Sequence, residues 1–86
     1  MPELSRFYGI IVRMYFDDHP PPHFHAMYGD EQVVIDIRQL AIITGGLSPR
    51  ALGLVMEWTA LRQSELLAAW TRAVSAQPPG NIAPLP

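Results

Sequence analysis

The sequence has 86 residues, no cysteine and a formal net charge of −2 from six basic and eight acidic side chains. This length suits a single domain, and an apolar content of 49% supports a packed core and argues against a disordered chain. The lack of cysteine excludes disulfides, thiolate nucleophiles and cysteine-bound zinc. All six basic residues are arginine. Because the net charge is negative, the chain as a whole has no general attraction to a phosphate backbone, which counts against a nucleic-acid-binding protein.

The sequence also bears on the cellular compartment. No stretch approaches the roughly 18 consecutive apolar residues of a membrane span. The segment from Met1 to Arg6 lacks the basic region and long apolar region of a secretion signal. Together with the absence of cysteine, these features predict a cytoplasmic protein that does not bind a membrane.

The segment from Phe7 to Phe16 alternates with a period of two and predicts one long strand. The run from Asp17 to Pro22 ends this strand, because successive prolines cannot donate ladder hydrogen bonds. Alternation resumes from His23 to Tyr28, and Gly29-Asp30-Glu31 reads as a turn. The predicted apolar face of the first strand comprises Tyr8, Ile10, Val12, Met14 and Phe16.

Two further strands are predicted, from Gln32 to Arg38 and from Leu40 to Thr44, with Gly45-Gly46 as the turn into the next element. Short connections between neighbouring strands favour antiparallel pairing. The sequence therefore predicts an antiparallel meander of three to four strands within residues 7–44. The inward residues of its third strand are Val33, Ile35 and Ile37.

A C-terminal helix is predicted over residues 49–75. Ser48 is a suitable N-cap, and Pro49 occupies the first helical position, where its missing N–H costs nothing. One unbroken helix would be about 40 Å long, whereas the strands span roughly 23 to 33 Å. Either the helix breaks near Gln63-Ser64, or its second half extends beyond the sheet.

The last ten residues, 77–86, are rich in proline, and we expect them to be extended with Ile82 and Leu85 as apolar anchors. The predicted fold is thus a single α+β domain over residues 1–86. An antiparallel meander is followed by one long helix, or two consecutive helices, packed on one sheet face.

The most concentrated chemistry is a hairpin with three histidines, His19, His23 and His25. On the strand from His23 to Tyr28, the apolar side chains alternate with the two histidines. Residues two apart share a face, with Cα atoms about 6.5 to 7 Å apart. His23 and His25 therefore point together away from the apolar face that the helix covers.

Other polar residues are predicted on the same face as the two histidines. Arg13 and Tyr15 come from the first strand, and Asp36 and Arg38 join them if the strand registers permit. Histidine titrates near neutrality, and a neighbouring arginine can stabilise an anionic transition state. The catalytic candidates are His23, His25, His19 and Arg13.

Metal binding is the second interpretation of the hairpin. A His-x-His pair on one strand can present two nitrogens to one zinc ion, with His19, Asp17 or Asp18 completing the ligand set. A third interpretation is structural, in which the histidines pack against prolines and donate hydrogen bonds to the loop backbone. The sequence leaves these alternatives open.

Trp58 and Trp70 lie in the helical stripe, where they serve either as core residues or as interface anchors. With Arg38 they are the candidates for contact with a partner protein. A short chain with a long apolar helix also has reason to form a homo-oligomer.

The specific sequence pattern is the hairpin Asp18-His19 followed by Pro21-Pro22-His23-Phe24-His25. The chain resembles, essentially end to end, the small bacterial proteins of the DUF4160 family, and this hairpin is the most specific part of the resemblance. The other segments that match the family are typical of residues that build the fold: Ser5 to Ile10, Met14-Tyr15, Tyr28-Gly29, Leu54 to Trp58, Glu65-Leu66, Trp70 and Ile82 to Leu85.

The resemblance implies a partner. Such proteins are often encoded beside a small protein of the DUF2442 family, and the pair resembles a type II toxin–antitoxin module with this chain as the toxin. The resemblance supplies no biochemical target. Many relatives carry histidine where this chain has Arg62, so a shared metal site that used that position would be altered here.

Three hypotheses follow. The leading one is a toxin that a small antitoxin-like protein holds inactive and that acts on RNA or a nucleotide through the His/Arg face. The alternative is a non-catalytic binding or regulatory module, dimeric through the tryptophan-bearing helix. The third is a metal-binding protein that uses the hairpin histidines. Only this last hypothesis requires a cofactor, a divalent metal.

Overall fold

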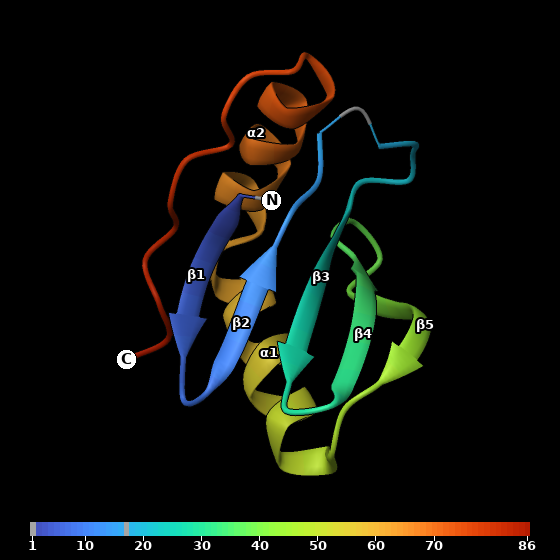
Figure 1. Cartoon of the computed structure of the whole chain (residues 1–86), viewed down its shortest axis with the longest axis vertical. Helices are drawn as coiled ribbons and strands as arrows, with labels where there is room; N and C mark the ends of the chain where they lie inside the picture. The colour runs from blue at the N-terminus through green and yellow to red at the C-terminus, as the bar shows by residue number, and fades with distance from the viewer. Residues whose placement is uncertain (1, 17) are drawn as a thin grey trace.

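The computed structural model describes residues 2–16 and 18–86 and contains a sheet of five antiparallel strands followed by two helices (Figure 1). The strands lie in chain order, so the sheet is the predicted meander with one strand more than the upper expectation. The α+β class is confirmed. The elements are β1 (Glu3–Phe7), β2 (Ile10–Arg13), β3 (His23–Tyr28), β4 (Glu31–Asp36), β5 (Ala41–Gly46), α1 (Pro49–Leu61) and α2 (Gln63–Val74).

The single strand predicted from Phe7 to Phe16 is wrong, because the chain reverses at Tyr8 and Gly9. These residues have φ angles of 49° and 82°, the positive values that a two-residue type I′ hairpin turn requires. Phe7 pairs with Ile10 across the turn. A tyrosine at positive φ is uncommon, and the usual Asn-Gly or Asp-Gly signal is missing. The sheet therefore begins at Glu3, before the predicted range.

The strand predicted from Gln32 to Arg38 is also too long. β4 ends at Asp36, whose carboxylate oxygen Oδ1 accepts hydrogen bonds from the backbone N–H groups of Arg38 and Gln39, both at 2.9 Å. This Asx-type turn bends the chain away from the sheet. Arg38 consequently lies in an exposed turn and not on a strand.

Gly45 and Gly46 belong to β5 and do not form the predicted turn after it. Gly45 pairs with Val33 and has a φ angle of 76°. A Cβ atom at this position would overlap the carbonyl oxygen of Gln32. Glycine is therefore required by the close approach of β4, which a sequence pattern does not reveal.

The helical segment breaks at Arg62, one residue from the predicted Gln63-Ser64 break, so α1 and α2 are consecutive helices. Pro49 occupies the first turn of α1 as predicted, but the Ser48 side chain makes no capping hydrogen bond. Instead the Ser48 N–H donates to Glu31 Oε1 at 2.9 Å. Both helices lie behind the sheet in Figure 1 and cover one of its faces. Among the described residues, neither helix has the length and apolar character needed to cross a membrane.

One apolar core fills the space between the sheet and the helices. Trp58 is fully buried in it, with its ring centroid 5.3 Å from that of Phe7 and 5.7 Å from that of Phe24. The Trp58 indole N–H donates to the carbonyl oxygen of Ala83 at 2.8 Å, so the hydrogen-bonding group of this large side chain is satisfied. Of the two roles considered for Trp58, the structure shows the core.

The C-terminal tail closes the side of the core next to β1 (Figure 1). Ile82 and Leu85 are buried, as expected of anchors. The backbone N–H of Ile82 donates to the carbonyl oxygen of Leu4 at 2.8 Å. The hydroxyl of Tyr8 donates to the carbonyl oxygen of Pro86 at 2.6 Å. The tail thus occupies the β1 edge of the sheet, while β5 forms the opposite edge.

Candidate functional site

β3 carries two different chemistries on its two faces. Phe24 and Ala26 are fully buried against the core, while His23 and His25 are half-buried on the other face. The alternation follows from the period of two in a strand. The registers place Arg13 opposite His25 on one side. On the other side, Asp36 lies opposite His23.

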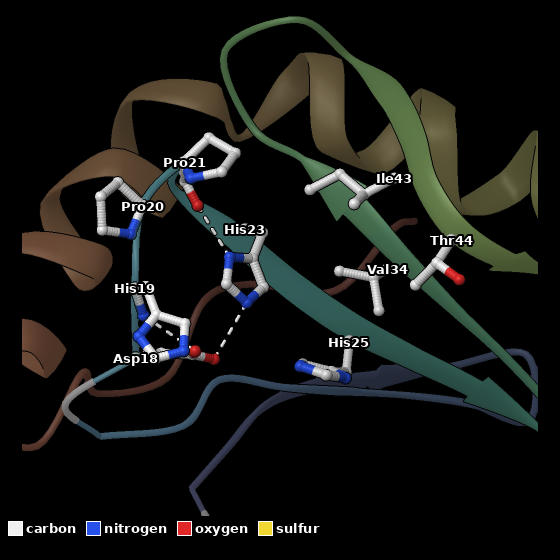
Figure 2. Close-up of a pocket in the computed structure, with 9 residues that line it drawn as sticks. All are labelled: Asp18, His19, Pro20, Pro21, His23, His25, Val34, Ile43 and Thr44. Carbon is white, nitrogen blue, oxygen red and sulfur yellow. Dashed lines mark hydrogen bonds and ion pairs between the residues drawn. The ribbon is translucent and has the colours of Figure 1, made fainter.

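An open pocket with a volume of about 300 Å³ lies over this face (Figure 2). The loop from Asp18 to Pro22, here called the proline-rich loop, forms one wall. β3 contributes the two histidines, and β4 and β5 add apolar surface. The lining residues are Asp18, His19, Pro20, Pro21, His23, His25, Val34, Ile43 and Thr44. The pocket therefore combines imidazoles and a carboxylate with an apolar wall.

The His23 ring is held at both nitrogens. Its Nδ1 lies 2.7 Å from the carbonyl oxygen of Pro21, and its Nε2 lies 2.9 Å from Oδ2 of Asp18. Figure 2 shows the ring between these two groups. Because a carbonyl oxygen only accepts hydrogen bonds, Nδ1 carries a hydrogen and donates it. The Trp70 ring of α2 packs against the imidazole with a centroid separation of 5.0 Å, so the orientation of His23 is fixed by the loop and by a helix.

Asp18 is held in turn by its own loop. Its Oδ1 accepts a hydrogen bond from the backbone N–H of His19 at 2.9 Å. Partial burial raises the pKa of the Asp18 carboxyl, but the hydrogen bond from His19 and the charge and hydrogen bond of His23 outweigh this effect. The net pKa shift is downward, so Asp18 presents an ionised carboxylate to His23.

The His25 ring is held by neighbours on either side of β3. Tyr15 meets it edge-on, with ring centroids 4.5 Å apart and an interplanar angle of 88°. The side-chain amide nitrogen of Gln32 donates to His25 Nδ1 at 2.9 Å. Burial lowers the pKa of His25, and the nearby charge of His23 lowers it further, while Asp18 opposes these effects. The neutral imidazole, which is the form that ligates cations, is therefore favoured.

The three side chains converge on one point of the pocket. Asp18, His23 and His25 each offer one ligand atom, and these atoms all lie within 4.8 Å of one another. This is the single group of three such side chains found within residues 2–16 and 18–86. His19 lines the pocket but lies outside the group. The predicted ligand Asp17 falls outside the described residues.

The predicted arginines are less central than the histidines. Arg13 is half-buried beside His25, and its buried Nε has no hydrogen-bond partner among the described residues. Neither Arg13 nor Arg38 is among the residues that line the described pocket. Arg62, where the resemblance implied histidine in many relatives, is also absent from that lining and lies at the break between the helices.

Trp70 takes a role that the sequence did not suggest. Its side chain is 8% exposed and packs against the ring of His23, so it helps to position that imidazole and offers little surface to a partner. Trp58 and Trp70 both pack internally, as one of the two predicted roles requires, and their contact with a partner protein stays a prediction. The contact between Trp70 and His23 depends on where the second helix lies, and no sequence signal indicates it.

Other residues around the histidines were not among the predicted site residues, for different reasons. Strand alternation predicts Val34 on the outward face, because it alternates with the inward Val33 and Ile35, and the same alternation could have placed Gln32 there. Ile43 and Thr44 reach the pocket through the β4–β5 pairing, whose register shifts at an irregularity between Val34 and Ile35. A register shift of this kind leaves no signal in the alternation.

Comparison with known proteins identifies the family. The family model described as "Domain of unknown function (DUF4160)" matches residues 9–71, more than half of the chain. The chain therefore belongs to this family. The matched range includes the proline-rich loop, β3 and the helices as far as Thr71. Searches of curated proteins and of solved structures found no match.

Proposed function

We propose that this member of the DUF4160 family is the toxin component of a bacterial type II toxin–antitoxin module and acts on RNA or a nucleotide through its histidine pocket. The observation that carries the proposal is the convergence of Asp18, His23 and His25 in an open pocket on the sheet face opposite the helices. A residue set of this kind is not needed to build the core, which lies on the other face of β3.

The size and the lining of the pocket favour a single nucleotide unit as the group recognised. A volume of about 300 Å³ is at the small end of the range for ligand pockets. Val34 and Ile43 offer apolar surface for a base beside the imidazoles, because Val34 pairs with His25 in the β3–β4 register. Arg13, which pairs with His25 in the register but does not line the pocket, is the arginine that we assign to a phosphate in this proposal. Such local recognition is compatible with a net charge of −2, whereas binding along an RNA backbone is not favoured.

The partner in this proposal is a small antitoxin-like protein of the DUF2442 type, and the compartment is the cytoplasm. The partner would inhibit the toxin by covering the pocket face. Arg38 is exposed in the turn that follows β4 and remains a candidate contact residue.

The test is growth of a bacterial host after induction of the parent chain or of the His23→Ala/His25→Ala variant. We expect arrest by the parent, no arrest by the variant, and relief of the arrest when the partner is expressed. Glu57→Gln is the control, because Glu57 is exposed on α1 away from the pocket. Circular dichroism establishes that each variant is folded. Equal growth arrest by the parent and the double variant would refute the role of the pocket. No arrest by a folded, expressed parent would refute the assignment of this chain as a toxin.

A non-catalytic binding module is the second candidate, and the β5 edge favours it. All six residues of β5 are exposed, and Ile42 and Ile43 are each 46% exposed. An edge strand with apolar side chains is a site for pairing with another chain. If this candidate holds, light scattering detects a dimer that Ile42→Lys disrupts. A monomeric parent at all concentrations excludes self-association through β5.

A further inference from the structure

We propose that Asp18, His23 and His25 bind one divalent transition-metal cation of the zinc type, with a fourth coordination position open to the pocket. The inference deepens the proposed function, on whose site it rests, because it assigns that site a cofactor. It stands on the geometry of three side chains that come from two segments, the proline-rich loop and β3.

The ligand atoms are close to the separation that a cation would impose. Zinc bonds of about 2.0–2.1 Å to nitrogen and oxygen in a tetrahedral site place the ligand atoms about 3.3 Å apart. The three atoms here lie within 4.8 Å of one another. His23 Nε2 and Asp18 Oδ2 are already separated by only 2.9 Å. The remaining separations, which involve His25, would close to about 3.3 Å when a cation binds.

Each of the three ligands is oriented by a second contact, as is usual for metal-binding side chains. The Nδ1–H of His23 donates to the carbonyl oxygen of Pro21, which leaves Nε2 as the ligand atom. Oδ1 of Asp18 accepts the N–H of His19, which leaves Oδ2 facing the pocket.

For His25, the orienting group is the side chain of Gln32 at Nδ1. The amide nitrogen of Gln32 faces this ring nitrogen. A half-turn of the amide presents its oxygen instead, so that Nδ1 carries the hydrogen and Nε2 is free for the cation. The Gln32 side chain can therefore form a hydrogen bond with either tautomer of His25.

The donor set selects the class of cation. Two imidazoles and one carboxylate suit zinc and its first-row neighbours, whereas magnesium and calcium prefer oxygen ligands. Three protein ligands leave a position for water or a substrate oxygen, as in catalytic zinc sites. The opening of the pocket gives an incoming phosphate oxygen access to this position. The cation would also supply positive charge where the net charge of the chain is negative.

The competing explanation is a metal-free hydrogen bond between His23 and Asp18. The two explanations differ at His25, which takes no part in that hydrogen bond but is required as the third ligand. They also differ at His19, which lines the same pocket without belonging to the group.

The test is isothermal titration of zinc chloride into the full chain, purified without a histidine tag. We expect one zinc ion per parent chain and at least about tenfold weaker binding by His25→Ala. Gln32→Ala, which keeps all three ligands, is expected to weaken binding by about 10- to 100-fold. His19→Ala is the matched control, since it also removes one imidazole, and its affinity should remain within about twofold of the parent.

Two outcomes would overturn the metal site. One is the absence of stoichiometric binding by the folded parent, and the other is equal weakening by His19→Ala and His25→Ala. The titration is independent of growth arrest, so failure of the two proposals can be distinguished. A parent that arrests growth without binding zinc refutes the metal site alone. A parent that binds zinc through His25 without arresting growth confirms the metal site and refutes the toxin.

Discussion

The two faces of β3 differ more sharply than any two elements of the fold. On one face, Phe24 and Ala26 are fully buried among the side chains of the helices and the other strands. On the other face, His23 and His25 are half-buried around an open pocket. The residues alternate along one short strand, so neighbours in the chain have different roles. One set stabilises the fold, and the other is available for chemistry.

This contrast predicts which substitutions should affect folding and which should affect function. Burial of apolar side chains is the main source of stability, and a chain of this size has little stability to lose. The histidines of the pocket face make polar contacts and are not part of the apolar core, so their removal costs less. The expected effects on stability therefore fall from the core face of β3 to the exposed edge of the sheet.

The largest effect is expected for Phe24→Ala. This change removes a fully buried aromatic side chain whose ring lies 5.7 Å from that of Trp58. We expect the free energy of unfolding to fall by about 3 to 5 kcal/mol, measured by urea denaturation. A loss below about 1 kcal/mol would mean that this face of β3 does not form the core.

Ile82→Ala tests whether the C-terminal tail belongs to the same core layer. Ile82 is 5% exposed, and its backbone bonds to Leu4. We expect a loss of about 2 to 5 kcal/mol, toward the lower end because the tail can relax around the smaller side chain. The exposed neighbour Asn81 provides the control, since Asn81→Ala should leave the urea midpoint unchanged. Equal effects of the two changes would show that the tail is not anchored through Ile82.

His25→Ala probes the pocket face at the position next to Ala26. The substitution removes the contacts with Tyr15 and Gln32 but leaves the core intact. We expect a change of no more than about 1 kcal/mol in the free energy of unfolding without metal. A loss of unfolding free energy as large as that of Phe24→Ala would contradict the assignment of different roles to the two faces of β3.

The smallest effect is expected for Ile42→Thr on the edge strand β5. Ile42 is 46% exposed, whereas its register partner Ile35 on β4 is fully buried. Ile42→Thr should change the free energy of unfolding by less than about 0.5 kcal/mol, and Ile35→Ala should lower it by about 2 to 5 kcal/mol. Thermal unfolding of the two variants side by side makes the comparison, and a similar loss from both would show that the β5 edge is covered in solution.

Much of this contrast could be predicted from the sequence, because strand alternation is a local property. The pattern from His23 to Tyr28 is sufficient to place the two histidines on one face and the apolar residues on the other. Helix signals around Pro49 similarly predicted where α1 starts. The excessive length of one helix left two alternatives, of which the structure shows the break, at Arg62.

The rest depended on geometry that sequence patterns do not encode. The turn at Tyr8 and Gly9 was missed, since the apolar alternation runs through it and tyrosine rarely adopts a positive φ. The support of His23 by Trp70 depends on how α2 packs, which is a tertiary effect. Asp18 was a candidate ligand among several, and only the folded loop distinguishes it from His19.

The assignment of the histidine face to chemistry can be tested by urea unfolding of the parent and the His23→Ala/His25→Ala variant, each with and without zinc chloride. Without metal, we expect a folded variant within about 2 kcal/mol of the parent. The substitutions remove polar and ring contacts, including that of His23 with Trp70, but no fully buried apolar side chain. With free zinc at 100 times its dissociation constant, the parent alone should gain about 2.7 kcal/mol. A variant that fails to fold, or an equal gain by both chains, would contradict the assignment of this face to chemistry.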